Sequence, residues 1–281
     1  MHVAREGEKK VGRFWSLLFL MVPVLGVLAF VFAASPDSKP FLDHWLPLNI
    51  NEQGYVIDDL FMFILYLTGV IFIITGVLLF RFLWKYDAAN NSEPVKYVHG
   101  NHSLEIIWSI LPAITLLFIA IYQMDAWAEH KMRRPLLEDG SLKPALAQVT
   151  ARQFEWRIRY AGPDEQVGTP DDIHIVNELH VPVDEDVVLQ VQSEDVLHSF
   201  FLPNLRIKQD LVPGMRQFSW FHANQGGIYD LVCAELCGWG HYKMRGRLVV
   251  ESREDFDAWL LEMAAEQERT QPEPAADGED E

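Results

Sequence analysis

The run LFMFILYLTGVIFIITGVLLF, from Leu60 to Phe80, contains neither a charged residue nor a proline. A helix of about 20 apolar residues spans the hydrocarbon core of a bilayer, because its backbone polar groups are all paired internally. Two further stretches, Phe14–Pro36 and Ile106–Met124, are long and apolar enough to do the same. The N-terminal part of the chain is therefore predicted to be helical and embedded in a membrane.

The first of these stretches has two interpretations. Lys9, Lys10 and Arg13 precede an apolar run that ends in VFAAS, a pattern that is also typical of a cleaved signal peptide. The apolar run is longer than the roughly 7 to 15 residues usual in signal peptides, which favours a retained helix. The other two stretches are predicted to form a transmembrane hairpin.

Basic residues beside the apolar stretches predict how the chain is oriented, because Lys and Arg favour the cytoplasmic side. They are Arg5, Lys9, Lys10 and Arg13 before the first stretch, and Arg81, Lys85 and Lys96 between the second and the third. We therefore expect a multi-pass protein of the cell inner (cytoplasmic) membrane. Everything after about Trp127 is expected on the periplasmic or outer side.

The carboxylates gather in this second part, and the 281-residue chain has a net charge of −17. An acidic balance without a basic stripe excludes nucleic acid as a partner and favours basic proteins. From Gln148 the hydrophobic period changes to two, which is typical of strands. The alternating stretches are QVTARQFEWRIRY, IHIVNELHV, VVLQVQS, MRQFSWFHA, GGIYDLVC and RGRLVVES. Short strands at this spacing predict a β-sandwich or barrel.

The fold class is accordingly a membrane-anchored all-β protein. The predicted parts are an N-terminal transmembrane helix or signal peptide (1–36), a two-helix hairpin (37–126), a linker (127–147), a β-domain with a C-terminal helix (148–266) and a disordered acidic tail (267–281). Within the C-terminal helix, the residues Phe256, Trp259, Leu260 and Met263 share one face. That face is predicted to pack on the strands.

Both cysteines of the chain lie in one short motif, CAELCGWGHYKM. Cys233, Cys237, His241 and Met244 offer thiolate, imidazole and thioether ligands, a soft set that favours copper. A structural disulfide and a zinc site are the competing interpretations, although zinc has no use for the methionine. With His198 from SEDVLHSFFLP as a second histidine there are more ligands than one tetrahedral ion uses. Two metals that share bridging sulfurs are therefore predicted.

With SEDVLHSF upstream and the hairpin before it, this motif resembles subunit II of the haem-copper cytochrome c oxidases. The resemblance covers roughly residues 55 to 262. It implies a cupredoxin-like β-sandwich that holds a dinuclear copper centre, CuA. The implied ligands are Cys233 and Cys237 as bridges, His198 and His241 on one copper each, Met244 as an axial ligand, and the backbone carbonyl of Glu235. The Glu235 side chain would also bind Mg or Mn at the interface with subunit I.

The resemblance also implies a function for this subunit within the oxidase. CuA would accept electrons one at a time from cytochrome c and pass them to haem in subunit I. Oxygen would be reduced to water there, coupled to proton pumping. The partners would be subunit I, which carries haem and CuB, the other oxidase subunits, cytochrome c and the membrane.

Further residues match positions with roles in that family. An aromatic segment near the first strand receives electrons, and here it holds Phe154 and Trp156, of which we favour Trp156. Glu194 and Asp195 match carboxylates that dock cytochrome c, and Glu105 matches a carboxylate at the entrance of a proton path. Packing in the core and a helix-dipole interaction are the alternative roles for the aromatics and for Glu105.

Three other functions compete with this one. A quinol oxidase subunit II has the same architecture but lacks the copper ligands that are complete here. A membrane-anchored copper-delivery protein would need one exposed copper and no docking surface, which the two-cysteine loop disfavours. A nitric-oxide reductase with a CuA subunit would look nearly the same from this chain.

Overall fold

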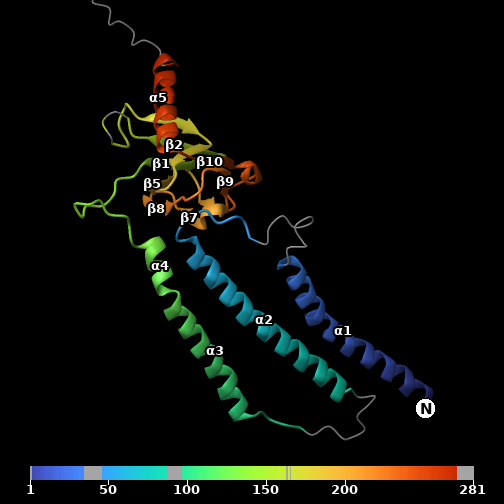
Figure 1. Ribbon diagram of the computed structural model, residues 1–281. Helices are drawn as coiled ribbons and strands as arrows, with labels where there is room; N and C mark the ends of the chain where they lie inside the picture. The colour runs from blue at the N-terminus through green and yellow to red at the C-terminus, as the bar shows by residue number, and fades with distance from the viewer. Residues whose placement is uncertain (1, 35–45, 88–96, 163, 165, 271–281) are drawn as a thin grey trace, which may run out of the picture. The chain divides into compact units, whose positions relative to one another are not determined.

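The computed structural model describes residues 2–34, 46–87, 97–162, 164 and 166–270 (Figure 1). The chain forms two compact units. The first unit comprises Met1–Leu46 and Asp58–Gln123, and the second comprises Pro47–Ile57 and Met124–Glu281. The predicted acidic tail beyond Thr270 and most of the connection between the hairpin helices lie outside the described residues.

Long helices make up the first unit: α1 (His2–Ala34), α2 (Gly54–Lys85, whose first turn belongs to the second unit) and α3 (His102–Tyr122). All three contain a stretch that is long and apolar enough to cross a membrane, as predicted. The side chain of Asn101 caps α3 by accepting a hydrogen bond from the backbone N–H of Leu104. This cap by Asn101 fixes where the helix begins.

A β-sandwich forms the body of the second unit (Figure 1). One sheet has the strand order β3-β2-β1-β5-β8 and the other has β4-β10-β9-β6-β7. The bounds are β1 Ala147–Arg152, β2 Glu155–Tyr160, β3 Ile173–Val176, β4 Glu178–Pro182, β5 Asp186–Ser193, β6 His198–Leu202, β7 Ile207–Leu211, β8 Gln217–His222, β9 Gly227–Cys233 and β10 Arg245–Glu251. Short helices α4 (Met124–Lys131), η2 (Pro203–Leu205) and η3 (His241–Lys243) complete the unit with α5 (Arg253–Thr270).

Two stretches that alternate without interruption each form two strands. In QVTARQFEWRIRY the chain turns at Gln153 and Phe154, so β1 and β2 pair antiparallel with Ala147 opposite Tyr160. In IHIVNELHV the chain changes sheets at Asn177, whose φ of 61° lies in the left-handed region. The Asn177 side chain also accepts a hydrogen bond from the backbone N–H of Trp156 at 2.7 Å. Asparagine tolerates this conformation better than most residues, which permits the switch.

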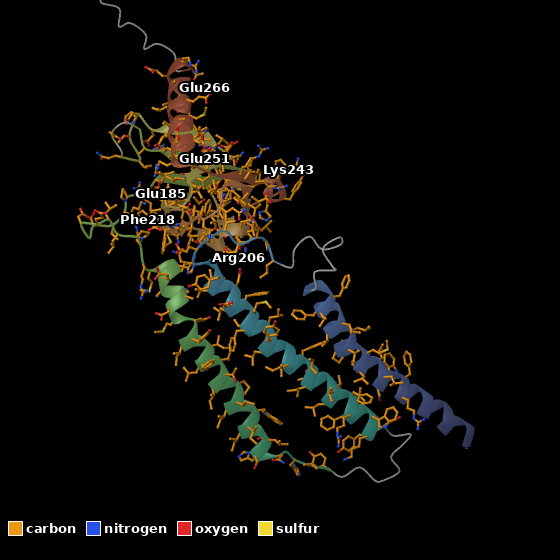
Figure 2. All side chains as sticks on the ribbon, in the orientation of Figure 1. Glu185, Arg206, Phe218, Lys243, Glu251 and Glu266 are labelled. Carbon is orange, nitrogen blue, oxygen red and sulfur yellow. The ribbon has the colours of Figure 1, made fainter. Side chains whose placement is uncertain are left out.

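Helix α5 packs on the sandwich through the predicted face. Phe256 is buried, and Trp259, Leu260 and Met263 pack against the same core. The Trp259 ring stacks on His180 with centroids 3.7 Å apart, and the His180 ring lies within hydrogen-bond distance of Glu178 and Glu251. Glu251, labelled in Figure 2, ends β10 just before α5 begins. The stack and these contacts hold the helix in place.

The segment just before α2 belongs to the second unit, although the sequence pattern groups it with the hairpin. The Ile50 side chain is fully buried among the sandwich residues. Its backbone N–H donates to the carbonyl of Asn204, its carbonyl accepts from the N–H of Asn224, and the Asn51 side chain donates to the carbonyl of Leu205. Residues far apart in sequence thus complete one core, which local periodicity does not reveal.

We expect Ile50→Ala to destabilise the sandwich by about 2–5 kcal/mol, because it removes buried methyl groups and leaves a cavity. Urea unfolding of the full chain in detergent, followed by tryptophan fluorescence, measures this. Leu48→Ala is the matched control, since Leu48 is half exposed, and it should change stability by less than about 0.5 kcal/mol. Equal effects of the two substitutions would show that the segment is not part of the core.

Candidate metal centre

Two strand ends and one loop bring the predicted ligands together. His198 begins β6 and Cys233 ends the neighbouring strand β9, where Phe200 pairs with Cys233. Residues 234–244 then form the loop to β10, which is closed by a hydrogen bond from the Cys233 N–H to the Met244 carbonyl. Lys243, labelled in Figure 2, lies on this loop. The loop is a short excursion between paired strands, so its ligands are held on a rigid base.

The ligand atoms cluster around the two neighbouring sulfurs. His198 Nδ1 lies 3.8 Å from Cys233 Sγ, which lies 3.8 Å from Cys237 Sγ, which in turn lies 3.7 Å from His241 Nδ1. Met244 Sδ lies 3.8 Å from Cys237 Sγ, and the Glu235 carbonyl oxygen lies 3.2 Å from Cys233 Sγ. All six predicted donors therefore meet in one place.

This arrangement fits a pair of soft metal ions. His198, Cys233 and Cys237 are buried, their ligand atoms lie within 4.8 Å of one another, and both cysteines are free thiols. Metal–sulfur distances are about 2.3 Å, so sulfurs 3.8 Å apart are close enough for one ion to contact both. One histidine nitrogen lies within 3.8 Å of each sulfur, so two ions that share the sulfurs would each have a histidine within reach. Thiolate, imidazole and thioether ligands favour copper over harder ions.

Asp195 orients the first histidine. Its carboxylate accepts from His198 Nε2 at 2.9 Å and from the backbone N–H groups of Gln153 and Val196. With its hydrogen on Nε2, the neutral imidazole directs the Nδ1 lone pair toward the cysteines. Burial opposes charge on His198, but Cys233 and Asp195 outweigh it and raise its pKa.

The two thiols differ strongly in acidity. Burial tends to raise the pKa of Cys233, but hydrogen bonds from His198 and from backbone groups of Ser199 and Glu235 outweigh it and lower the pKa to about 6. Burial and the neighbouring Cys233 thiolate raise the pKa of Cys237 to about 12. One sulfur is thus ready to bind metal at neutral pH, and the other must release a proton as the metal binds.

Comparisons with known proteins agree with this geometry. The family "Cytochrome C oxidase subunit II, periplasmic domain" matches residues 160–252, and its "transmembrane domain" matches residues 51–125. Cytochrome c oxidase subunit 2 of Alkalihalophilus pseudofirmus is 30% identical over 92% of this chain and 70% of its own length. The chain belongs to the cytochrome c oxidase subunit II family. Its second unit is accordingly a CuA-type periplasmic domain with a cupredoxin-like fold. The chain is a component of a respiratory oxidase.

Two further relatives extend this comparison. Cytochrome c oxidase subunit 2 of Thermostichus vulcanus is 31% identical over 76% of this chain and 77% of its own length. The crystal structure of the periplasmic domain of subunit II of cytochrome oxidase from Bradyrhizobium japonicum is 29% identical, covers 43% of this chain and 93% of that one, and has a TM-score of 0.38. The two family models leave between them residues 126–159, which contain the β1–β2 turn of this oxidase subunit.

That turn changes the expectation for the aromatic residues. Trp156 is fully buried, with its ring 5.7 Å from Phe200 and 6.5 Å from His198, so its indole is not available to a partner at the surface. Phe154 lies in the turn and not on the same strand face as Trp156, and it is only partly buried. Its ring meets the exposed ring of Trp239 at 5.1 Å. The sequence pattern did not single out Trp239.

The predicted docking carboxylates of the oxidase subunit differ in their surroundings. Glu194 is half exposed and lies 3.3 Å from Arg157, whose guanidinium also contacts Glu155. Asp195 accepts hydrogen bonds from His198 and from two backbone N–H groups, so it acts inside the site. Gln153 was not predicted, yet its side chain donates to the Cys237 carbonyl at 2.6 Å and ties the turn to the copper loop.

Glu105 lies in the first turn of α3 within the other unit. Its carboxylate lies 3.2 Å from His102 Nδ1 and is about half exposed. This position suits the dipole of the helix, since a negative charge stabilises the N-terminal end. The proton-path role of Glu105 stays a prediction.

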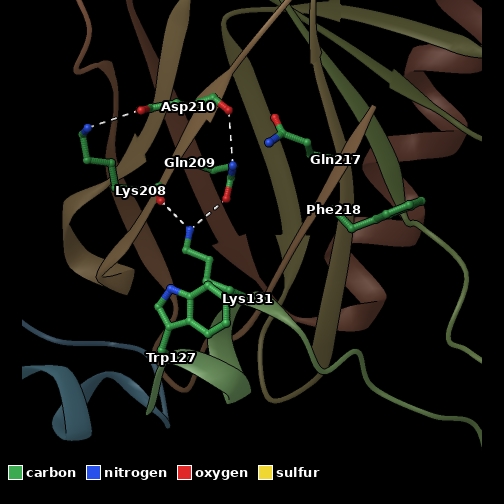
Figure 3. A pocket seen from close by; sticks show the side chains of 7 residues that line it. All are labelled: Trp127, Lys131, Lys208, Gln209, Asp210, Gln217 and Phe218. Atoms are coloured by element: carbon green, nitrogen blue, oxygen red, sulfur yellow. Dashed lines mark hydrogen bonds and ion pairs between the residues drawn. The ribbon is translucent and has the colours of Figure 1, made fainter. Parts of the chain in front are cut away.

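A separate hollow of about 500 Å³ lies in the second unit, lined by Trp127, Lys131, Lys208, Gln209, Asp210, Gln217 and Phe218 (Figure 3). Lys131 on α4 donates to the Lys208 carbonyl at 2.7 Å and to Gln209 Oε1 at 2.8 Å. Burial lowers the pKa of Lys131. These bonds attach α4, which directly follows α3 in the chain, to strand β7. The hollow contains none of the predicted metal ligands.

Proposed function

We propose that this chain is the electron-accepting subunit of a cytochrome c oxidase. Its ligands would hold a CuA centre, which would supply one-electron chemistry between cytochrome c and the haem of subunit I, where oxygen would be reduced to water with proton pumping. The observation that carries the proposal is the pair of neighbouring sulfurs with a histidine nitrogen within 3.8 Å of each. A dinuclear copper centre would supply one-electron chemistry with little change in its ligand geometry.

The residues of the chain have distinct roles in this proposal. Cys233 and Cys237 would hold both ions, His198 and His241 would each hold one, and the remaining donors would be Met244 Sδ and the Glu235 carbonyl oxygen. Burial of the sulfurs keeps water away, and the strands β6 and β9 fix the ligands before metal binds. Preorganised ligands reduce the rearrangement that accompanies a change of charge.

Contacts with the rest of the oxidase follow from the same family membership. We propose that the Glu235 side chain binds Mg or Mn at the interface with subunit I, since a carboxylate suits such hard ions. We assign Glu105 to the entrance of a proton path into subunit I. The helices are proposed to cross the inner membrane with their basic flanks in the cytoplasm and the CuA domain on the periplasmic side.

The proposal is tested on the oxidase complex that contains this chain. Reduced cytochrome c is mixed with the oxidised complex in a stopped-flow instrument, and the copper and haem absorbances are followed separately. We expect the copper band to bleach before haem is reduced, and oxygen to be consumed. Haem reduction that precedes copper reduction would contradict the relay role. Consumption of nitric oxide and not oxygen would identify the reductase alternative.

The role assigned to Asp195 gives a second test. In Asp195→Ala the imidazole of His198 loses its partner, and we expect a loss of about 10–100-fold in copper affinity, as when the supporting group of a ligand is removed. Competition with a chelator during copper titration measures this. Asp230→Ala removes an exposed carboxylate that pairs with Arg245 on the neighbouring strand, and it should leave the affinity unchanged. Unchanged affinity in Asp195→Ala would reduce Asp195 to a surface charge.

A further inference from the structure

The copper loop presents a large aromatic ring to solvent. Trp239 lies between Cys237 and His241, two residues from each, and 82% of its surface is exposed. Leu236 and Tyr242 in the same loop are also exposed, at 75% and 71%. Exposed tryptophans are costly to leave in water and are enriched among the residues that dominate protein interfaces. This surface is therefore a candidate contact for a partner.

Phe154 holds the Trp239 ring from the opposite loop. The two rings meet edge to face at 5.1 Å, although Phe154 comes from the β1–β2 turn. The glycines on either side of Trp239 make this contact possible. A Cβ at Gly240 would lie 2.5 Å from the Phe154 ring, and one at Gly238 would lie 3.2 Å from it. The Phe154 ring thus rests directly on the backbone of the copper loop.

Other contacts fix the same arrangement. Gln153, beside Phe154 in the turn, donates its side-chain N–H to the carbonyl of Cys237, a metal ligand, at 2.6 Å. The N–H of Gln153 donates to Asp195, which orients His198. The turn is therefore bonded both to the copper loop and to the support of the first histidine. Trp239 and Phe154 sit on a scaffold that is continuous with the ligands.

The charges beside this surface are of both signs. Glu194 and Glu155 share the guanidinium of Arg157, and Asp195 keeps its negative charge while it accepts from His198 and from backbone N–H groups. Lys243, next to Tyr242 in the loop, adds an exposed positive charge. Charges of this kind mainly steer an encounter, and the exposed rings of the loop add apolar contact.

We propose that Trp239 is the residue through which the electron donor contacts this subunit, with Phe154 as its positioning residue. The donor is a haem protein whose apolar haem edge lies exposed at its surface, because a flat apolar edge suits an exposed indole. One electron leaves the ferrous haem, which becomes ferric, and the copper pair gains it; no bond or proton changes place. This inference rests on the proposed function and names the surface at which it operates.

The test uses the full oxidase complex with cytochrome c as the donor. Trp239→Ala should lower both the second-order rate constant for electron delivery and the affinity for cytochrome c by at least about tenfold, as for a residue at the centre of an interface. Affinity is measured by surface plasmon resonance on the copper-loaded and on the copper-free protein, since docking does not require the metal. Trp239→Phe should recover part of both. Phe154→Ala should weaken both to a lesser degree.

Two further readouts separate this role from damage to the centre. The copper absorption spectrum and the rate of electron transfer onward to haem, started by flash photoreduction, should be unchanged in Trp239→Ala. Leu261→Ala, which removes an exposed leucine on α5, should change nothing.

Wild-type affinity and delivery rate in Trp239→Ala would overturn the proposal, while an intact copper spectrum would leave the relay function standing. A wild-type complex without two coppers would instead contradict the proposed function itself.

Discussion

Replacing Cys233 by serine is expected to lower the copper content of the chain from two ions to at most one and to abolish any signal shared between two coppers. Cys233 lies at the centre of the ligand cluster, because His198, Cys237 and the Glu235 carbonyl all lie within 3.8 Å of its sulfur. A hydroxyl is a poor substitute for a soft bridging thiolate. Copper quantitation and EPR spectroscopy on the purified full chain measure both effects.

The control for this substitution is a histidine outside the ligand cluster. His222 lies on β8, bonded to Asp186 at 2.9 Å, and His222→Ala should keep both coppers and the wild-type spectrum. His241→Ala should behave like Cys233→Ser, since His241 Nδ1 lies 3.7 Å from Cys237 Sγ and is one of the two histidine ligands. Two coppers in Cys233→Ser would show that the sulfur is not a bridge.

Trp156→Ala is expected to destabilise the copper-free sandwich by about 3–5 kcal/mol, which is the range for large aromatic side chains in a core. The ring is fully buried and packs against Phe200 at 5.7 Å and beside His198 at 6.5 Å. Its loss leaves a cavity directly under the first histidine. Urea unfolding without copper measures the change, because bound metal would itself add stability.

A matched pair of tryptophans makes this result interpretable. Trp239→Ala removes the same side chain from an exposed position, and it should change stability by less than about 0.5 kcal/mol. Trp156→Phe should lie between the two, since it leaves a smaller cavity. A mild Trp156→Ala variant would mean that the ring is not part of the core, and the electron-input role first favoured for it would then be open again.

Much of this architecture could be predicted from local patterns. The apolar stretches are long enough to identify three helices without any tertiary information. The period of two identified the strands, and the types and spacings of Cys233, Cys237, His241 and Met244 predicted a soft metal site. These features are local in sequence, so neighbouring residues alone carry the signal. His198 also came within reach, because a histidine at a strand end is easily recognised.

Features that depend on tertiary contact were not predicted. The alternation through Gln153 and Phe154 continues across a turn, so it does not reveal that Phe154 lies in the turn while Trp156 is buried in the core. Asp195 could be matched to a docking carboxylate, but only its 2.9 Å contact reveals that it supports His198. The backbone of Ile50 is hydrogen-bonded to Asn204 in η2 and to Asn224 just after β8, which joins segments far apart in the sequence. No pattern within a short window records such contacts.

The exposure of Trp239 shows the same limit from the other side. The sequence does contain a signal that points to Trp239. Glycines flank this residue, and a loop of metal ligands leaves few positions for a large side chain. Only the structure shows that Phe154 occupies the space over those glycines and that the indole faces solvent. An accessible surface is a property of the folded chain.

The central claim is that the two cysteines and two histidines hold a pair of coppers as one electronic unit. The most direct measurement is copper quantitation combined with EPR spectroscopy on the purified full chain. The account predicts two coppers per chain. In the mixed-valence state, with one Cu(I) and one Cu(II), it predicts a single unpaired electron whose hyperfine coupling is shared equally between both nuclei. One copper or none, with a disulfide between Cys233 and Cys237 after copper loading, would contradict it.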